Sequence, residues 1–128
     1  MDRLSRRLVL ADAALASFEE LVARTAESSV ARDAAILRFQ YSFESVWKAA
    51  QHKLRERDGI EAGSPKQVIR ACLEAGILDA DRARHALELA DDRNLTVHTY
   101  NEPLAKALTE RLPRHSILLR EWLDRLKS

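Results

Sequence analysis

Apolar residues recur along this chain at alternating intervals of three and four residues, which is the period of an amphipathic α-helix. The first such run predicts a helix over residues 3–26 with an almost strict heptad seam. The positions of this seam are Leu4, Leu8, Ala11, Leu15, Phe18, Val22 and Thr25. Charged residues fall away from the seam, so we expect this helix to pack in an antiparallel bundle.

A second helix is expected to begin at a cap formed by Ser28 or Ser29 and to run to about Arg57. It carries the heaviest apolar stripe, which consists of Ile36, Phe39, Phe43, Val46, Trp47, Ala50 and Leu54. An aromatic stripe at helical spacing predicts core packing. Tyr41 and His52 fall off this stripe, and we expect His52 on the surface.

A short third helix is predicted by a capping box with proline in its first turn, Ser64-Pro65-Lys66-Gln67, and it should end at Gly76. Asp79 or Asp81 is expected to cap a fourth helix. The predicted inner stripe of this helix is Ala83, Leu87, Ala90 and Asn94, followed by Val97 or His98. A buried polar group needs a partner, so the end of the stripe indicates either an internal hydrogen-bond network or a shared interface site. The small side chains at 83, 86 and 90 would suit a dimer seam.

The last helix is predicted to begin at an Asn101 cap and to contain a kink at Pro113, which has no N–H to donate to the carbonyl of Thr109. Its apolar positions are Leu104, Leu108, Leu112, Leu119, Trp122 and Leu126. His115 is expected to be exposed. Together these elements predict an all-α fold, an up-and-down bundle of four long helices and one short helix in a single domain spanning 1–128.

Composition places the chain among ordinary soluble proteins, with 46% hydrophobic and 32% charged residues. The formal net charge of +1 gives no general attraction to nucleic acid or membrane, so any contact with RNA must come from a local patch. A single cysteine, Cys72, excludes a disulfide framework or a cysteine metal site within one chain. No apolar run is long enough to span a membrane and no signal-peptide pattern is present, so we expect a cytoplasmic protein.

The chemically richest stretch is Asp91–Pro103, DDRNLTVHTYNEP. Arg93 and His98 are five residues apart, which rotates them by roughly 140° on an ideal helix. An unbroken helix therefore does not bring the guanidinium and the imidazole together. Either the helix ends or bends near His98, where β-branched residues weaken it, or a second copy of the chain completes the site.

Arg93 offers a planar fork of donors for phosphate oxygens, and a histidine such as His98 can take or give a proton at physiological pH. This combination suits metal-free cleavage of RNA, in which a histidine handles the proton of the 2′-hydroxyl and an arginine stabilises the charge on phosphorus. The spacing alone is a weak signal, because the commoner outcome is a surface arginine and a structural histidine. Asp91 and Asp92 lack further ligands in register for a metal, so we expect them to orient Arg93 or to face solvent.

The segment RNLTVHTY resembles the R-x4-H-x-Y signature of the HEPN family, in the branch encoded beside minimal nucleotidyltransferases. Members of this branch are called nucleotidyltransferase substrate-binding proteins or HepT-type toxins. Three blocks in the same order are similar to this branch, Arg32–Ala49, Ser64–Leu78 and Leu89–Ala105.

The resemblance implies a homodimeric helical bundle in which the R-x4-H motifs of both chains meet in a cleft at the interface. It implies Arg93 and His98 as the catalytic pair of a metal-independent endoribonuclease toxin without a cofactor, with Asn94 and Asp92 in support. It also implies Tyr100 as the residue on which a partner nucleotidyltransferase places AMP from ATP, which silences the toxin. Two alternatives stay open: a non-catalytic nucleotide- or substrate-binding subunit of a two-component nucleotidyltransferase, and a dimeric scaffold whose polar residues form a buried network.

Overall fold

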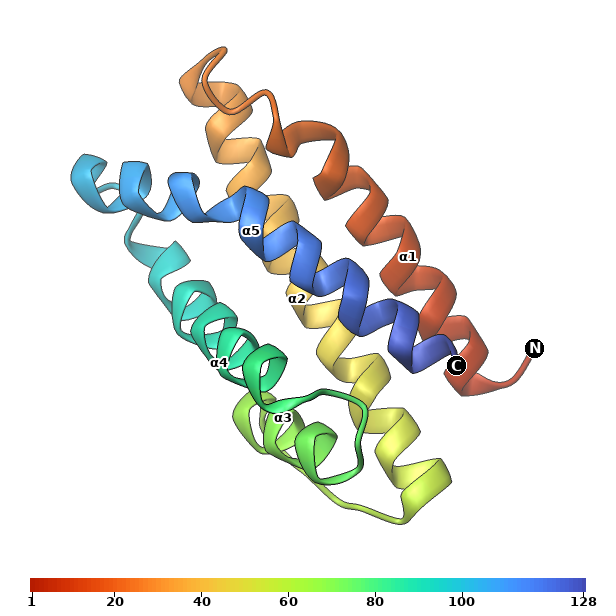
Figure 1. Ribbon diagram of the computed structural model, residues 1–128. Helices are drawn as coiled ribbons and strands as arrows, with labels where there is room; N and C mark the ends of the chain where they lie inside the picture. The colour runs from red at the N-terminus through yellow and green to blue at the C-terminus, as the bar shows by residue number, and fades with distance from the viewer.

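The computed structural model describes residues 1–128 and contains helices and no strands (Figure 1). The helices are α1 (Arg3–Val22), α2 (Ser29–Asp58), α3 (Pro65–Glu74), α4 (Ala80–Leu95) and α5 (Glu102–Lys127), with a 3-10 turn, η1 (Thr96–His98), between the last two. The predicted all-α bundle with one short helix is confirmed. No helix is both long enough and apolar enough to cross a membrane.

Every helix begins at a residue whose side chain accepts a hydrogen bond from a backbone N–H of the first turn, which satisfies one of the free donors there. These caps are Asp2, Ser28, Ser64, Asp79 and Asn101. The sequence predicts the last four of them correctly. The first helix ends at Val22 rather than residue 26, because the chain turns after Val22 toward the extended backbone of Ser28.

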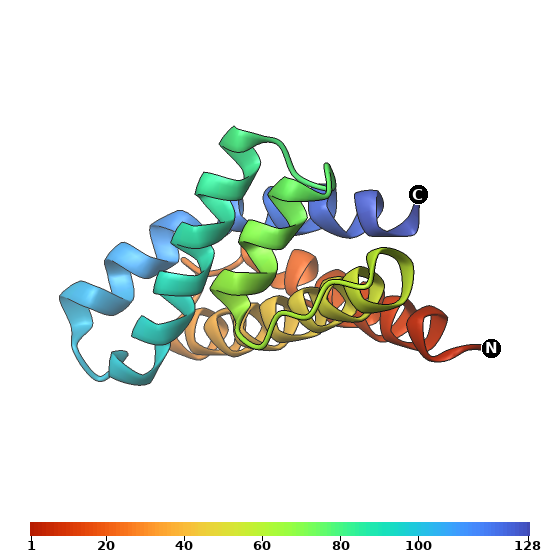
Figure 2. The same ribbon diagram turned by 90° about the horizontal axis from the view of Figure 1, so that it is seen from below.

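The 30-residue helix α2 is the central element, since it contacts each of the other helices. Its predicted apolar stripe is buried throughout. Figure 2 shows α3 and α4 lying side by side and crossing α2 steeply, on the side from which α5 also packs. Because α2 is covered from several directions, His52 is buried and its imidazole lies 3.1 Å from Glu56; the prediction of a surface His52 is wrong.

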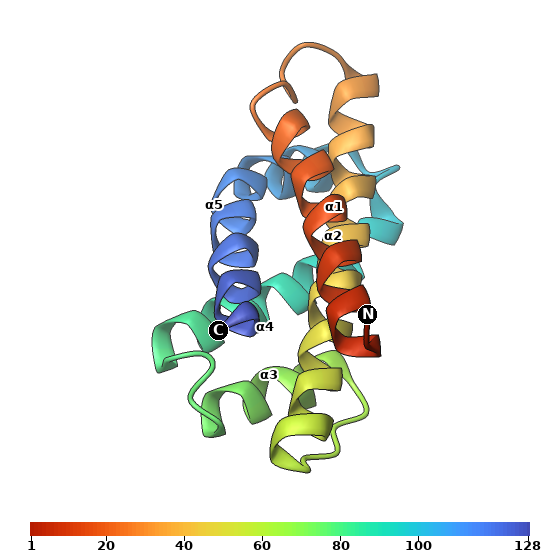
Figure 3. The ribbon, with the colours of Figure 1, turned by 90° about the vertical axis from the view of Figure 1, so that its right-hand side faces the viewer.

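Helix α5 runs antiparallel to α1, with Arg120 paired to Asp12 and Glu19 and Lys127 paired to Asp12. Both chain termini therefore lie at the same end of the bundle (Figures 1 and 3). The ribbon of α5 changes direction along its length in Figure 1, as expected for a helix that contains Pro113.

The buried face of α4 differs from the predicted stripe. Its buried residues are Ala83, Ala86, Leu89, Ala90 and Asp92. Asn94, Val97 and His98 are exposed, and Leu87 is only half-buried, so the polar end of the predicted stripe does not enter the core. Ala83, Ala86 and Ala90 are buried inside the bundle and are not free for a dimer seam, so that prediction is wrong.

Candidate functional site

The fourth helix ends at Leu95 and continues as the 3-10 turn that contains His98. Thr96 holds this junction, because its hydroxyl donates to the backbone carbonyl of Arg93 at 2.6 Å and accepts from the Gln40 side chain. The hydroxyl thus satisfies a carbonyl at the end of the helix. The predicted break near His98 is confirmed.

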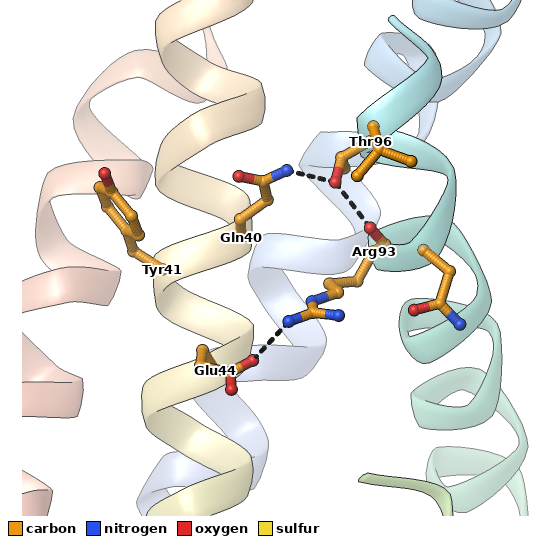
Figure 4. A pocket seen from close by; sticks show the side chains of 7 residues that line it. Gln40, Tyr41, Glu44, Arg93 and Thr96 are labelled. Atoms are coloured by element: carbon orange, nitrogen blue, oxygen red, sulfur yellow. Dashed lines mark hydrogen bonds and ion pairs between the residues drawn. The ribbon is translucent and has the colours of Figure 1, made fainter.

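Arg93 and Asn94 face a cavity of about 380 Å³ between the end of α4 and the middle of α2, which we call the Arg93 cavity. It is lined by Gln40, Tyr41, Glu44, Arg93, Asn94, Thr96 and Val97. Figure 4 shows the guanidinium of Arg93 directed from α4 toward Glu44 on α2. The two side chains pair at 3.1 Å, between Nη2 and Oε2.

Two side chains besides Arg93 contact the Glu44 carboxylate. The indole N–H of Trp47 donates to Oε2 at 3.2 Å, and the ammonium of Lys48 lies 3.5 Å from Oε1. Two cations, Arg93 and Lys48, therefore contact this carboxylate, and of the two only Arg93 lines the cavity. An anionic group entering the cavity would meet Arg93 in place of that carboxylate.

His98 does not line the Arg93 cavity and is exposed. Its Nδ1 lies 3.5 Å from the hydroxyl of Tyr100, and the two rings meet edge to face with centroids 6.0 Å apart. Tyr100 is 83% exposed. The end of the helix therefore leaves Arg93 and His98 in different surroundings within one chain.

The side chain of Asp92 pairs with His115 and Arg111 and not with the neighbouring Arg93. Its Oδ2 is 2.6 Å from His115 Nε2, and Arg111 donates to both of its oxygens at 2.8 Å. Burial opposes ionisation of Asp92, but the hydrogen bonds from His115 and Arg111 outweigh it, and the pKa of the carboxyl falls to about 2. The expectations that Asp92 faces solvent and that His115 is exposed are wrong, because the two side chains bury each other. The expectation that Asp92 orients Arg93 stays a prediction.

Gln40, Tyr41 and Glu44 are cavity residues that the sequence analysis did not identify. A signal was present, because Gln40, Glu44 and Lys48 recur every four residues and so lie along one face of α2. The heavier apolar stripe of the same helix obscured that polar row. No group of three or more histidine, cysteine, aspartate or glutamate side chains is arranged to hold a metal ion.

This all-helical arrangement is shared with toxins of the HEPN class. The tri-AMPylated HEPN toxin of Shewanella oneidensis, solved in complex with its MNT antitoxin, matches with a TM-score of 0.80 at 14% identity, over 99% of this chain and 98% of that one. At this level of identity the likeness shows the fold alone. The predicted HEPN-like fold is thereby confirmed.

Residues 6–128 match the family described as nucleotidyltransferase substrate binding protein like, and the chain belongs to this family. A protein of Thermus thermophilus is 52% identical, with a TM-score of 0.89 over 92% of this chain and 99% of that one. The HI0074 protein of Haemophilus influenzae, described as having the fold of a substrate binding domain of a nucleotidyltransferase, is 25% identical, with a TM-score of 0.79 over 94% of this chain and 99% of that one. A search of curated proteins gave no significant match.

Proposed function

We propose that this protein is the toxin of a toxin–antitoxin pair, a metal-independent endoribonuclease whose site is assembled by two copies of the chain. Arg93 of one copy acts with the partner's His98. The observation that carries the proposal is the separation of these residues within one chain: Arg93 lies in a cavity that could hold a phosphate, while His98 is exposed outside it.

Exposed apolar side chains at the rim of the Arg93 cavity support assembly by a second copy. Tyr41 is 57% exposed and Val97 is 69% exposed, although both line the cavity. Leu37, one turn before Tyr41 on α2, is also exposed. Apolar side chains gathered around a polar cavity are typical of an interaction surface.

The chemistry is a transesterification, in which the 2′-oxygen of one nucleotide bonds to the phosphorus on its own 3′-oxygen and the bond from phosphorus to the 5′-oxygen of the next nucleotide breaks. A neutral His98 takes the proton of the 2′-hydroxyl as this oxygen bonds to phosphorus, and the 5′-oxygen leaves with a proton from a second group or water. Arg93 donates to the phosphoryl oxygens on which negative charge develops. Asn94, at the mouth of the same cavity, can donate to or accept from the bound nucleotide.

Tyr100 is the proposed site of silencing by a partner nucleotidyltransferase. Its hydroxyl would attack the α-phosphorus of ATP, form a phosphodiester to AMP and release pyrophosphate. The high exposure of Tyr100 makes the hydroxyl accessible, and its 3.5 Å approach to His98 would put the new anion beside the proposed catalytic imidazole. The bulky, charged group would then hinder entry of RNA phosphate.

The second candidate is a non-catalytic subunit that presents a nucleotide to the partner nucleotidyltransferase. The family description and the likeness to HI0074 favour it. The Arg93 cavity would then bind a nucleotide phosphate without cleaving it.

Growth and RNA integrity after induction without the partner separate these candidates. The wild type, His98→Ala and His52→Gln should be compared, since His52 is a histidine outside the proposed site. Growth arrest with fragmented RNA in the wild type and His52→Gln, but not in His98→Ala, supports the nuclease. Unimpaired growth and intact RNA in all three contradict the nuclease and favour the binding subunit.

A further inference from the structure

A network of hydrogen-bonded polar side chains, which we call the Asp92 network, joins α4 to α5 and takes no part in the chemistry above. Asp92 and His115 are buried in it, and His85 and Arg111 are half-buried. His85 Nε2 lies 2.9 Å from His115 Nδ1, and His115 Nε2 lies 2.6 Å from Asp92 Oδ2. Arg111 completes the network with two hydrogen bonds to Asp92. His115 has no exposed surface, and its ring stacks on Phe39 of α2 with centroids 5.5 Å apart.

The direction of these hydrogen bonds follows from the charges. An ionised Asp92 can only accept, so His115 must carry its proton on Nε2. The bond between His115 Nδ1 and His85 Nε2 needs a proton on one of these two nitrogens, and protonation of both would break it.

The Asp92 network fixes the position of α4 along α5. His85 and Asp92 are seven residues apart, about two helical turns, and the two nitrogens of His115 reach one of them each. Arg111 and His115 lie on either side of Pro113, yet both converge on Asp92. A movement of α4 along its axis, or a change in the kink of α5, would break at least two of these bonds.

Asp92 is adjacent to Arg93, so what holds one residue limits the other. Three consecutive residues of α4 each pair with a different helix: Asp91 with Lys66 of α3 at 2.6 Å, Asp92 with α5, and Arg93 with Glu44 of α2 at 3.1 Å. The pair at Asp91 is largely exposed, whereas Asp92 is buried. The Asp92 network is therefore the most constrained of the three anchors of this turn.

We propose that Asp92 and His115 are positioning residues, which hold the last turn of α4 so that the Arg93 guanidinium is directed into its cavity. The catalytic consequence rests on the proposed nuclease function, whereas the effect on the Arg93 side chain does not. Disrupting the Asp92 network displaces Arg93 while leaving the bundle folded.

The test compares Asp92→Asn and His115→Gln with His52→Gln, a change at another buried histidine that is not part of the Asp92 network. NMR of the full-length protein reads the Arg93 Nε–H signal, assigned by its disappearance in Arg93→Lys. We expect this signal to shift in Asp92→Asn and His115→Gln and to stay in place in His52→Gln. In the wild type, the imidazole nitrogen spectrum should show His115 protonated at Nε2.

Kinetics on an RNA oligonucleotide supply the second readout. A positioning role predicts that Asp92→Asn and His115→Gln lower kcat by roughly ten- to a hundredfold with little change in KM, while His52→Gln keeps wild-type values. If His115→Gln does not fold, His85→Ala replaces it, because His85 is the half-buried end of the network and its loss removes the hydrogen-bond partner of His115 Nδ1.

An unmoved Arg93 signal in folded Asp92→Asn and His115→Gln variants would overturn the proposal. The Asp92 network would then be a purely structural element. If the wild type cleaves no RNA, the nuclease function fails, but the NMR result still decides whether the Asp92 network positions Arg93.

Discussion

Arg93 Nη2 lies 3.1 Å from Glu44 Oε2, so the guanidinium proposed to bind phosphate is already paired with a carboxylate. A phosphodiester entering the cavity must compete with Glu44 for the same donors. Both side chains are substantially exposed, 41% for Arg93 and 33% for Glu44. An ion pair at this exposure contributes up to about 1 kcal/mol. Glu44 would therefore oppose the proposed binding of RNA by a modest amount.

Replacing Glu44 with glutamine is expected to tighten RNA binding. The substitution removes the competing charge but retains a side chain of similar size, and a gain of up to about 1 kcal/mol corresponds to roughly fivefold in Kd. Fluorescence anisotropy on His98→Ala and on His98→Ala/Glu44→Gln measures binding without cleavage. Weaker binding in the double variant would mean that Glu44 orients Arg93 for phosphate instead of competing with it.

Asp92 should make the free energy of unfolding depend on acid pH. Its pKa of about 2 lies below the ordinary value of 3.8, so the stabilisation is complete above the ordinary value and is lost as the pH falls toward 2. The shift corresponds to about 2 kcal/mol. Urea unfolding from pH 7 to pH 2 should show the stability difference between the wild type and Asp92→Asn shrinking with acid. A difference independent of pH would contradict the ionised network.

Leu89 and Leu87 test which face of α4 is buried. Leu89 is completely buried, whereas Leu87, which the sequence pattern places on the inner stripe, is half-buried. Leu89→Ala should cost roughly 2–5 kcal/mol of stability by leaving a cavity. Leu87→Ala should cost clearly less, and denaturant unfolding of the two variants gives the comparison. Equal losses would contradict the observed orientation of the helix.

The difference at α4 shows where sequence patterns reach their limit. Strong stripes and caps, as in α2 and at Ser28, Ser64 and Asn101, are local features and predict the fold well. The inner face of α4 consists mainly of alanines, and the helix packs against three other helices, so periodicity alone does not identify that face. The candidate site was predicted from the short motif that contains Arg93, His98 and Tyr100. Such a motif identifies the residues of a site, but it does not predict which side chains surround them in the fold.

Contacts between residues distant in sequence were the part that could not be predicted. His115 is 23 residues from Asp92, and Glu44 is 49 residues from Arg93. Nothing local to His115 or to Asp92 indicates their pairing, because it depends on how α4 and α5 come together after the 3-10 turn. The expected exposure of both residues followed from treating each one alone.

Tyr100→Phe should remove the proposed acceptor of AMP while leaving the fold intact, because the side chain is almost fully exposed. After incubation with the partner nucleotidyltransferase and ATP, intact-mass spectrometry should show added AMP on the wild type and none on Tyr100→Phe. Tyr41→Phe is the matched control, since Tyr41 is the other tyrosine of the chain and is also exposed. Modification that persists in Tyr100→Phe would place the acceptor elsewhere.

Complementation between two inactive variants tests the composite site most directly. Arg93→Ala and His98→Ala each lack one proposed catalytic group, but a dimer containing one copy of each retains one site with both groups. Co-refolding the two variants in equal amounts should therefore restore about a quarter of wild-type RNA cleavage, because half of randomly assembled dimers are mixed and each has one of its two sites intact. Either variant alone should stay inactive. If the mixture is as inactive as its components while the wild type cleaves RNA, Arg93 does not act with the partner's His98.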